Sequence, residues 1–250
     1  MPNKNTLLGP IFGYTTQHFS TLWVKGRKGW KATARWKAES TGNWQKKTLN
    51  LNPLLDFTGI TQIFFPIAKQ PITVEILFYP EAASDPEVND ERWTSQNVEI
   101  LRGRVRPAPA SDAEFCFIAG SCSHRGYGLG RKGGEAFQTI LENDSGTQGV
   151  VHAELADFIL MMGDQVYADH PINDLVPFIP WIAANNPPNS TEGYFVKYRH
   201  DFSNISLRNL MATLPVYMIL DDHEVENNWG GYLYREKREK KICLQYFQET

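Results

Sequence analysis

Hydrophobic and polar positions alternate with a period of two in the first hundred residues of the chain. The clearest case is the run ITVEILFYP, in which Val74, Ile76 and Phe78 occupy every second position. Leu49 and Leu51 repeat the pattern in a shorter run. Because successive side chains of a strand point to opposite faces, this alternation predicts short β-strands with one buried face. Turn dipeptides separate the runs at the spacing of a β-sandwich, namely Lys28-Gly29, Gly42-Asn43 and Asn52-Pro53.

A further strand is predicted at residues 97–105. It places Arg102, Arg104 and Arg106 on one face, which suggests either an anion-binding patch or, as we favour, an edge strand protected by charge. The following RPAPAS segment is typical of a stiff, extended linker. We therefore predict a β-sandwich domain at residues 1–106 and a second domain at residues 112–250.

Beyond the linker, apolar strand-like runs alternate with helical patterns. Strands are predicted at 114–119, 158–162 and 215–220, and helices at 135–143, 149–156, 193–200, 207–213 and from about 234 to the end. A Pro- and Asn-rich insertion covers 171–190. This order predicts parallel strands joined by crossover connections, hence an α/β domain.

Composition narrows the functional class. The 250 residues are 42% hydrophobic and 21% charged, which is typical of a folded globular protein, and no apolar run has the length of a membrane span. A net charge of −3 argues against a nucleic-acid binder, and three cysteines cannot form a disulfide framework. No export signal is visible at the N-terminus, which predicts a cytoplasmic location. The oligomeric state is not indicated.

Polar residues follow each of the three apolar strands of the second domain. Cys122 follows the first strand and Asp164 the second, while Asp221, Asp222 and His223 follow the third. Ligands of open α/β sheets bind outside the carboxyl ends of the strands, so these side chains are expected to meet in space. Adjacent carboxylates repel each other unless a cation or protons neutralise them, which favours a metal site.

Each of these residues also has a structural interpretation. Asp164 could cap the next segment, Tyr167 could pack in the core, and the acids after the third strand could be solvated charges at a helix start. Cys122 is interpreted first as a metal ligand, then as an inert small residue, and last as a nucleophile. Arg125, in the glycine-rich loop after Cys122, could hold a phosphate group.

Three segments together resemble the alkaline phosphatase D (PhoD-like) family of the metallophosphoesterase superfamily. They are FIAGSCS, ADFILMMGDQVYAD and LRNLMATLPVYMILDDHEVENNW, and they extend from about residue 115 to residue 229. The resemblance implies an immunoglobulin- or fibronectin-like β-sandwich followed by the first part of a metallophosphoesterase-like α/β sandwich. It also implies hydrolysis of phosphomonoesters or phosphodiesters with two metal ions, iron plus calcium or another divalent cation.

The resemblance also implies a role for each matching residue. Cys122 corresponds to a thiolate ligand, Asp164 to the carboxylate that bridges both metals, and Tyr167 to an iron ligand. Asp222 corresponds to a ligand of the second metal, and we place the neighbouring Asp221 in the same metal set. His223 corresponds to the histidine that contacts phosphate and protonates the leaving group. We assign Arg125 and Asn227 to substrate binding.

Two departures from the family leave other hypotheses open. First, no Gly-His-x-His motif follows Trp229, so we expect the second domain to be incomplete at its C-terminal end. Second, family members are often exported, whereas no export signal is visible in this sequence. The alternative is a non-catalytic binding or scaffold protein with a degenerate phosphoesterase domain, motivated by the apolar stretch at residues 175–183. A cysteine-dependent hydrolase is the third hypothesis.

Overall fold

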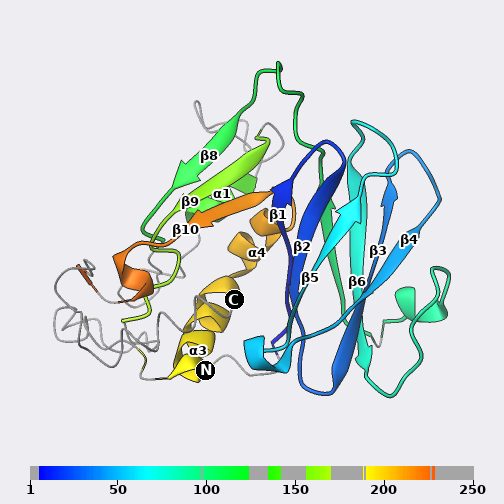
Figure 1. Cartoon of the computed structure of the whole chain (residues 1–250), viewed down its shortest axis with the longest axis horizontal. Coiled ribbons are helices and arrows are strands. Elements are labelled where there is room, and N and C mark those ends of the chain that lie inside the picture. Colours follow the sequence, from blue (N-terminus) through cyan, green and yellow to red (C-terminus); the bar gives the residue numbers. More distant parts are fainter. Residues whose placement is uncertain are drawn as a thin grey trace.

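The computed structural model describes residues 6–96, 98–123, 135–141, 156–169, 188, 190–225 and 227–228. The first part consists of seven strands: β1 (Leu8–Thr15), β2 (Phe19–Lys25), β3 (Trp30–Ala38), β4 (Gln45–Leu49), β5 (Thr58–Phe64), β6 (Ile72–Pro80) and β7 (Ile100–Val105). They form two antiparallel sheets, in the orders β1-β2-β5 and β4-β3-β6-β7 (Figure 1). Two short 3-10 helices, η1 (Pro53–Leu55) and η2 (Glu91–Trp93), lie in the connections.

Both sheets contribute side chains to one apolar core. Leu22 and Ile63 come from the first sheet, and Val74, Ile76 and Phe78 come from β6 of the second; all five are fully buried. The period-two pattern of β6 therefore marks the face that packs against the other sheet. On the opposite face of β6, Leu77 is also buried, because Trp93 of η2 covers it together with Tyr79.

Strand β7 lies at the edge of its sheet, and its arginines are engaged there. Arg102 pairs with Glu75 at 2.9 Å, and Arg104 pairs with Glu39. Arg106, just beyond the strand, donates to the main-chain oxygen of Ala156. This arrangement supports the interpretation as a charge-protected edge strand over that of an anion-binding patch.

The second part contains a parallel sheet. Its strands β8 (Phe117–Gly120), β9 (Phe158–Met162) and β10 (Val216–Ile219) lie in the order β10-β9-β8. Its described helices are α1 (Glu135–Leu141), α3 (Thr191–Phe202), α4 (Ile205–Met211) and the 3-10 turn η3 (Asp222–Glu224). Ser190 caps α3 and Asn204 caps α4, each accepting from main-chain N–H groups of the first turn.

These elements match most of the α/β pattern predicted within the described residues. Strand β9 has the predicted bounds, and α1, α3 and α4 overlap the predicted helices. Residues 149–155 of one predicted helix, nearly all of the insertion at 171–190, and the predicted final helix lie outside the described residues. No described helix combines the length and the apolar character required to cross a membrane.

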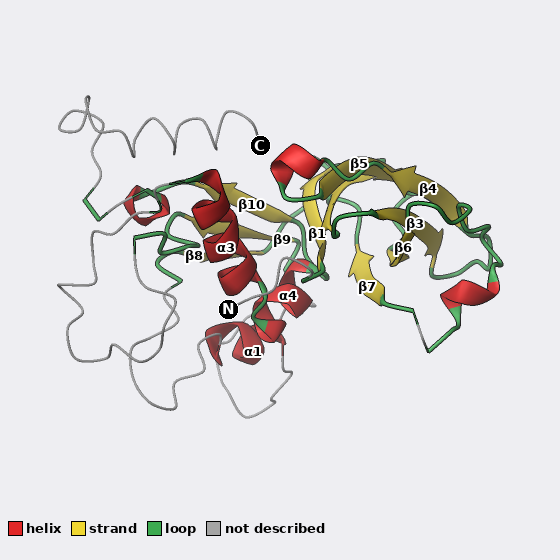
Figure 2. Ribbon diagram, turned by 90° about the horizontal axis from the view of Figure 1, so that it is seen from below, coloured by secondary structure: helices red, strands yellow, loops and turns green. Residues whose placement is uncertain are grey.

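The two parts pack directly against each other (Figure 2). Leu8 and Ile11 of β1 belong to the same buried cluster as Ile159 of β9, Leu210 of α4 and Val216 of β10. Main-chain contacts reinforce the junction: Phe12 forms a parallel bridge with Pro215, and the N–H of Arg104 donates to the oxygen of Ala212 at 2.8 Å. The β1-β2-β5 sheet thus completes the core of the parallel sheet, and so positions the strand ends described next.

Candidate metal centre

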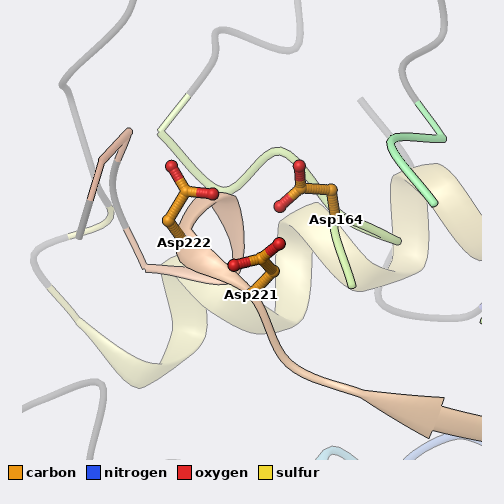
Figure 3. Close-up of side chains that lie close together, drawn as sticks. All are labelled: Asp164, Asp221 and Asp222. Atoms are coloured by element: carbon orange, nitrogen blue, oxygen red, sulfur yellow. The ribbon is translucent and has the colours of Figure 1, made fainter. Parts of the chain in front are cut away.

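The carboxyl ends of the parallel strands bring three aspartates together. Asp164 follows β9, and Asp221 and Asp222 follow β10 (Figure 3). One carboxylate oxygen from each lies within 4.8 Å of the others. Cys122, after β8, lies beside them, with its Sγ 3.4 Å from Oδ2 of Asp164. These strand-end residues therefore lie together at one edge of the sheet, as the strand order predicted.

Strained backbone conformations at the strand ends hold these side chains close together. Cys122 and Asp164 have positive φ angles of 56° and 54°, which non-glycine residues adopt at a cost. Gly163, at φ +95°, leaves no room for a side chain, because a Cβ there would lie 2.4 Å from the Cβ of Asp221. The N–H of Cys122 donates to the oxygen of Gly163 at 3.2 Å, so the ends of β8 and β9 are tied together.

Glu224 braces the site from inside the protein. Its side chain is fully buried and accepts main-chain N–H groups of Asp164 at 3.0 Å, Asp221 at 2.8 Å and Val166 at 3.1 Å. Burial raises the pKa of this carboxyl, while the three N–H donors oppose the rise. Glu224 thus joins the ends of β9 and β10 rather than adding an oxygen to the aspartate cluster. The Asp-x-x-Glu spacing from Asp221, a capping-box pattern, is the sequence signal for this role.

A second buried acid, Asp169, orients His223. Asp169 is fully buried, and its Oδ1 lies 3.0 Å from Nδ1 of His223. A carboxylate accepts hydrogen bonds, so Nδ1 carries its proton on this contact and Nε2 is the ring nitrogen left available to hold or release a proton. The N–H of Asn227 donates to Oδ2 of Asp169 at 2.8 Å, and the ring of Tyr167 packs on the imidazole at 4.2 Å between centroids.

Tyr167 lies beside the cluster and is affected by its charge. Burial raises the pKa of the phenol, and the nearby charges of Asp164, Cys122 and Asp222 raise it further. The phenol is therefore neutral at physiological pH unless a cation is present to favour the phenolate. Tyr167 would therefore ligate a metal as the phenolate only where the positive charge of that metal lowers the pKa of the phenol again.

The structure brings together most, but not all, of the residues assigned from the sequence. Cys122, Asp164, Tyr167, Asp221, Asp222 and His223 lie at one edge of the sheet. Asn227 is adjacent through its main-chain bond to Asp169, and Arg125 lies outside the described residues. Two further acids, Asp169 and Glu224, are buried in hydrogen bonds that support the site.

The cluster has an excess of negative charge. Asp164 is 4% exposed, yet among the described residues none of the three aspartates forms an ion pair with lysine or arginine. Burying a carboxylate beside two others is unfavourable without a compensating positive charge. Three carboxylates with an adjacent thiol and phenol are donors that suit a metal ion, so the residues present fit a metal site.

Comparison with known proteins agrees with this geometry. Residues 135–246 match the family model of PhoD-like phosphatases. This part of the chain is therefore similar to that family. The PhoD-like resemblance predicted from the strand-end motifs is thereby confirmed. No curated protein matches the chain.

Two solved structures share the fold over nearly the whole chain. The structure of PhoD superposes with a TM-score of 0.64 at 15% identity, covering 99% of this chain and 45% of PhoD. The purple acid phosphatase PPD1 from seeds of yellow lupin (Lupinus luteus) superposes with a TM-score of 0.53 at 11% identity, covering 98% of this chain and 40% of that protein. The chain thus shares its fold with part of each of these two phosphatases and spans less than half of their length.

Proposed function

We propose that this chain provides the catalytic carboxylates of a metal-dependent phosphoesterase acting on phosphomonoesters or phosphodiesters. The observation that carries the proposal is the cluster of Asp164, Asp221 and Asp222 at the ends of parallel strands, in a chain with a PhoD-like segment. A hydrolase that handles an anionic phosphate needs positive charge at its site. Cations bound by the aspartates would supply that positive charge.

The metal set that we propose uses the donors according to their chemistry. Asp164 would bridge two ions, with Cys122 and Tyr167 completing an iron site and Asp221 and Asp222 holding calcium or another divalent cation. Thiolate and phenolate donors suit iron, whereas carboxylates alone suit hard divalent cations. Such ions, when bound, would polarise the phosphoryl oxygens and lower the pKa of water for an in-line attack.

His223 is the proposed acid. With Nδ1 held by Asp169, its ring is fixed in orientation, and the tilted contact with the Tyr167 ring restricts it further. A proton carried on Nε2 would pass to the leaving-group oxygen as the phosphorus–oxygen bond breaks, while water provides the new oxygen. Arg125 and Asn227 are proposed to bind the equatorial oxygens of the phosphate.

The domain organisation remains part of the proposal. We propose that residues 1–106 form an immunoglobulin- or fibronectin-like β-sandwich, and that residues 112–250 form the first part of a metallophosphoesterase-like α/β sandwich. The shared core of the two antiparallel sheets supports the first assignment. The parallel order β10-β9-β8 supports the second.

The test is hydrolysis of bis(p-nitrophenyl) phosphate and p-nitrophenyl phosphate by the chain loaded with iron and calcium. We expect turnover that chelation abolishes and that Asp164→Ala reduces by at least about 100-fold, because the bridging oxygen is lost. The matched control is Asp112→Ala, an exposed aspartate that is not a member of the cluster, which should retain full activity. Turnover that survives both Asp164→Ala and chelation would refute the proposal.

Elemental analysis separates this function from the alternative of a non-catalytic scaffold. Stoichiometric iron in the purified chain supports the enzyme, whereas a stably folded chain that takes up no metal supports a degenerate domain. A cysteine-dependent hydrolase would instead lose activity on thiol alkylation and be indifferent to chelators. The apolar stretch 175–183 that motivated the scaffold hypothesis lies outside the described residues.

A further inference from the structure

A groove with apolar walls lies between the β1-β2-β5 sheet and helix α3, away from the metal centre. In Figure 1, α3 (yellow) lies below β10 and to the left of the β1-β2-β5 sheet. One wall carries Trp23 and Ile60, and the other carries Phe195 and Tyr198 of α3 together with Met218 of β10. Its volume of about 340 Å³ is that of a small-molecule site, which typically measures roughly 300–1,000 Å³.

Buried charges line one part of this groove. Lys25 and Arg199 are each only 1% exposed, and Asp56 is 9% exposed. Arg199 Nη1 lies 2.6 Å from Oδ2 of Asp56, and Lys25 Nζ lies 3.7 Å from the same oxygen while donating to two main-chain carbonyls. Two buried cations therefore share one buried carboxylate.

The nearest additional acid does not restore the balance inside the groove. Glu192 contacts Arg199 Nη2 at 2.8 Å, but its side chain is 45% exposed and its charge is screened by solvent. Arg199 Nε is buried and has no hydrogen-bond acceptor among the described residues. A buried N–H without an acceptor is costly, and an entering anion would satisfy it.

The titration behaviour of the cluster is consistent with a binding site. Burial lowers the pKa of Lys25 and raises the pKa of Asp56. Ionisable groups whose pKa values are shifted by burial in a cavity mark candidate ligand sites. A buried ion pair is often no more stabilising than apolar residues of similar volume, so its presence favours a role in binding. The groove therefore combines apolar walls with an excess of positive charge at its buried part.

We propose that this groove binds a single-chain amphiphile with an anionic head, specifically an alkyl carboxylate. The carboxylate would accept from Arg199 Nε near Lys25, and the alkyl chain would lie between Trp23 and Ile60 on one side and Phe195 and Met218 on the other. None of these residues belongs to the aspartate cluster. The site is therefore separate from the proposed phosphoesterase centre.

Calorimetric titration of the full chain with octanoate, decanoate and dodecanoate, below their micellar concentrations and with EDTA present, tests the proposal. Burial of each added methylene should tighten binding about fourfold until the groove is full. Dodecanol, which has the same chain without the charge, should bind about tenfold or more weakly than dodecanoate, because it cannot form the charge-assisted bond. Absence of saturable binding, or equal affinity for dodecanoate and dodecanol, would overturn the proposal.

A matched pair of surface variants locates the site without disturbing the buried charges. Ile60 is 63% exposed at the groove, and Ile205 is 64% exposed on α4 outside it. Ile60→Ser should weaken dodecanoate binding about tenfold, since part of the apolar wall is lost, while Ile205→Ser should leave it unchanged. Equal effects of the two substitutions would show that dodecanoate binds elsewhere and would refute this assignment. Because no turnover is measured, failure here leaves the phosphoesterase proposal unaffected.

Discussion

The strand-end cluster and the groove cluster of charged side chains differ in the sign of their members. The strand-end cluster, Asp164, Asp221 and Asp222, is entirely negative and has no lysine or arginine partner among the described residues. The groove cluster combines Asp56 with two cations, Lys25 and Arg199. The first can be neutralised only from outside the cluster, whereas the carboxylate of the second offsets one of its two cations.

This difference distinguishes two uses of charge in one fold. Where opposite signs meet, the residues bind each other and leave a modest preference for an anion. Where like charges are forced together by strained backbone and a close glycine contact, the protein tolerates repulsion that a cation would relieve. Repulsion maintained by structure is therefore the better indicator of a metal site.

The largest expected effect comes from the acid that braces the strand-end cluster. Glu224→Ala should lower the free energy of unfolding by about 3–5 kcal/mol, because three buried N–H groups lose their acceptor. The matched control is Glu192→Ala, a half-exposed acid that pairs with Arg199 of the groove cluster, which should cost about 1 kcal/mol or less. Urea unfolding measures both. Equal losses would mean that the two regions do not differ in this way.

Metal ions should stabilise the folded chain by binding at the strand-end cluster and not at the groove cluster. Mn²⁺ at about 100 times its dissociation constant should raise the free energy of unfolding by about 2.7 kcal/mol. Asp164→Asn should remove most of that gain, because it replaces the most buried carboxylate of the cluster. Asp56→Asn should retain the gain, and its loss in that variant would place the ion in the groove instead. Thermal or urea unfolding with and without Mn²⁺ provides the comparison.

The close packing at the strand ends can be separated from its positive φ angle. Gly163→Ala should cost about 2 kcal/mol more than Gly29→Ala, because a Cβ at Gly163 meets Asp221 whereas Gly29 has open space around it. Both glycines have positive φ, of 95° and 74°, so the backbone penalty is common to the two variants. Urea unfolding gives the difference. Equal costs would show that Asp221 can move away freely.

The smallest effect is relief of repulsion in the metal-free chain. In EDTA at low salt, Asp222→Asn should raise the free energy of unfolding by about 0.5–1 kcal/mol, and added salt should reduce the gain through screening. A metal-free Asp222→Asn chain that is less stable than wild type would contradict mutual repulsion.

The control for this variant is Asp90→Asn, where a cation is present. Hydrogen bonds from Arg92 lower the pKa of Asp90 to about 2. A depressed pKa contributes stability above the ordinary value of 3.8 that is lost as the pH falls toward 2, so at pH 7 removing this charge should lower stability slightly. Urea unfolding at pH 7 and pH 2 measures this difference.

Much of the fold could be predicted because its signals are local. Alternation located β6, apolar runs located β9 and β10, and the parallel order implied that their ends meet. The start of β8 was predicted three residues early. In the structure, the N–H of Cys116 donates to the side chain of Asp157 instead of to a neighbouring strand, and such a contact between distant residues leaves no local pattern.

The remainder of the site and the groove depend on contacts between distant segments. The burial of Asp169 and Glu224 is not visible in a run of acidic letters, so the sequence could not separate them from the exposed Asp221. The groove is even less accessible to sequence reasoning. Lys25, Asp56 and Arg199 meet only because the first antiparallel sheet packs against α3.

The packing of β1 has a consequence for cooperativity. Leu8 and Ile11 lie in the buried cluster of the parallel sheet, although they precede the linker at 106–111 by some ninety residues of chain. The two parts should therefore unfold in a single transition, with equal calorimetric and van't Hoff enthalpies, and residues 112–250 alone should not fold. Folding of the N-terminal strands then also contributes the free energy that holds the three aspartates in their relative positions.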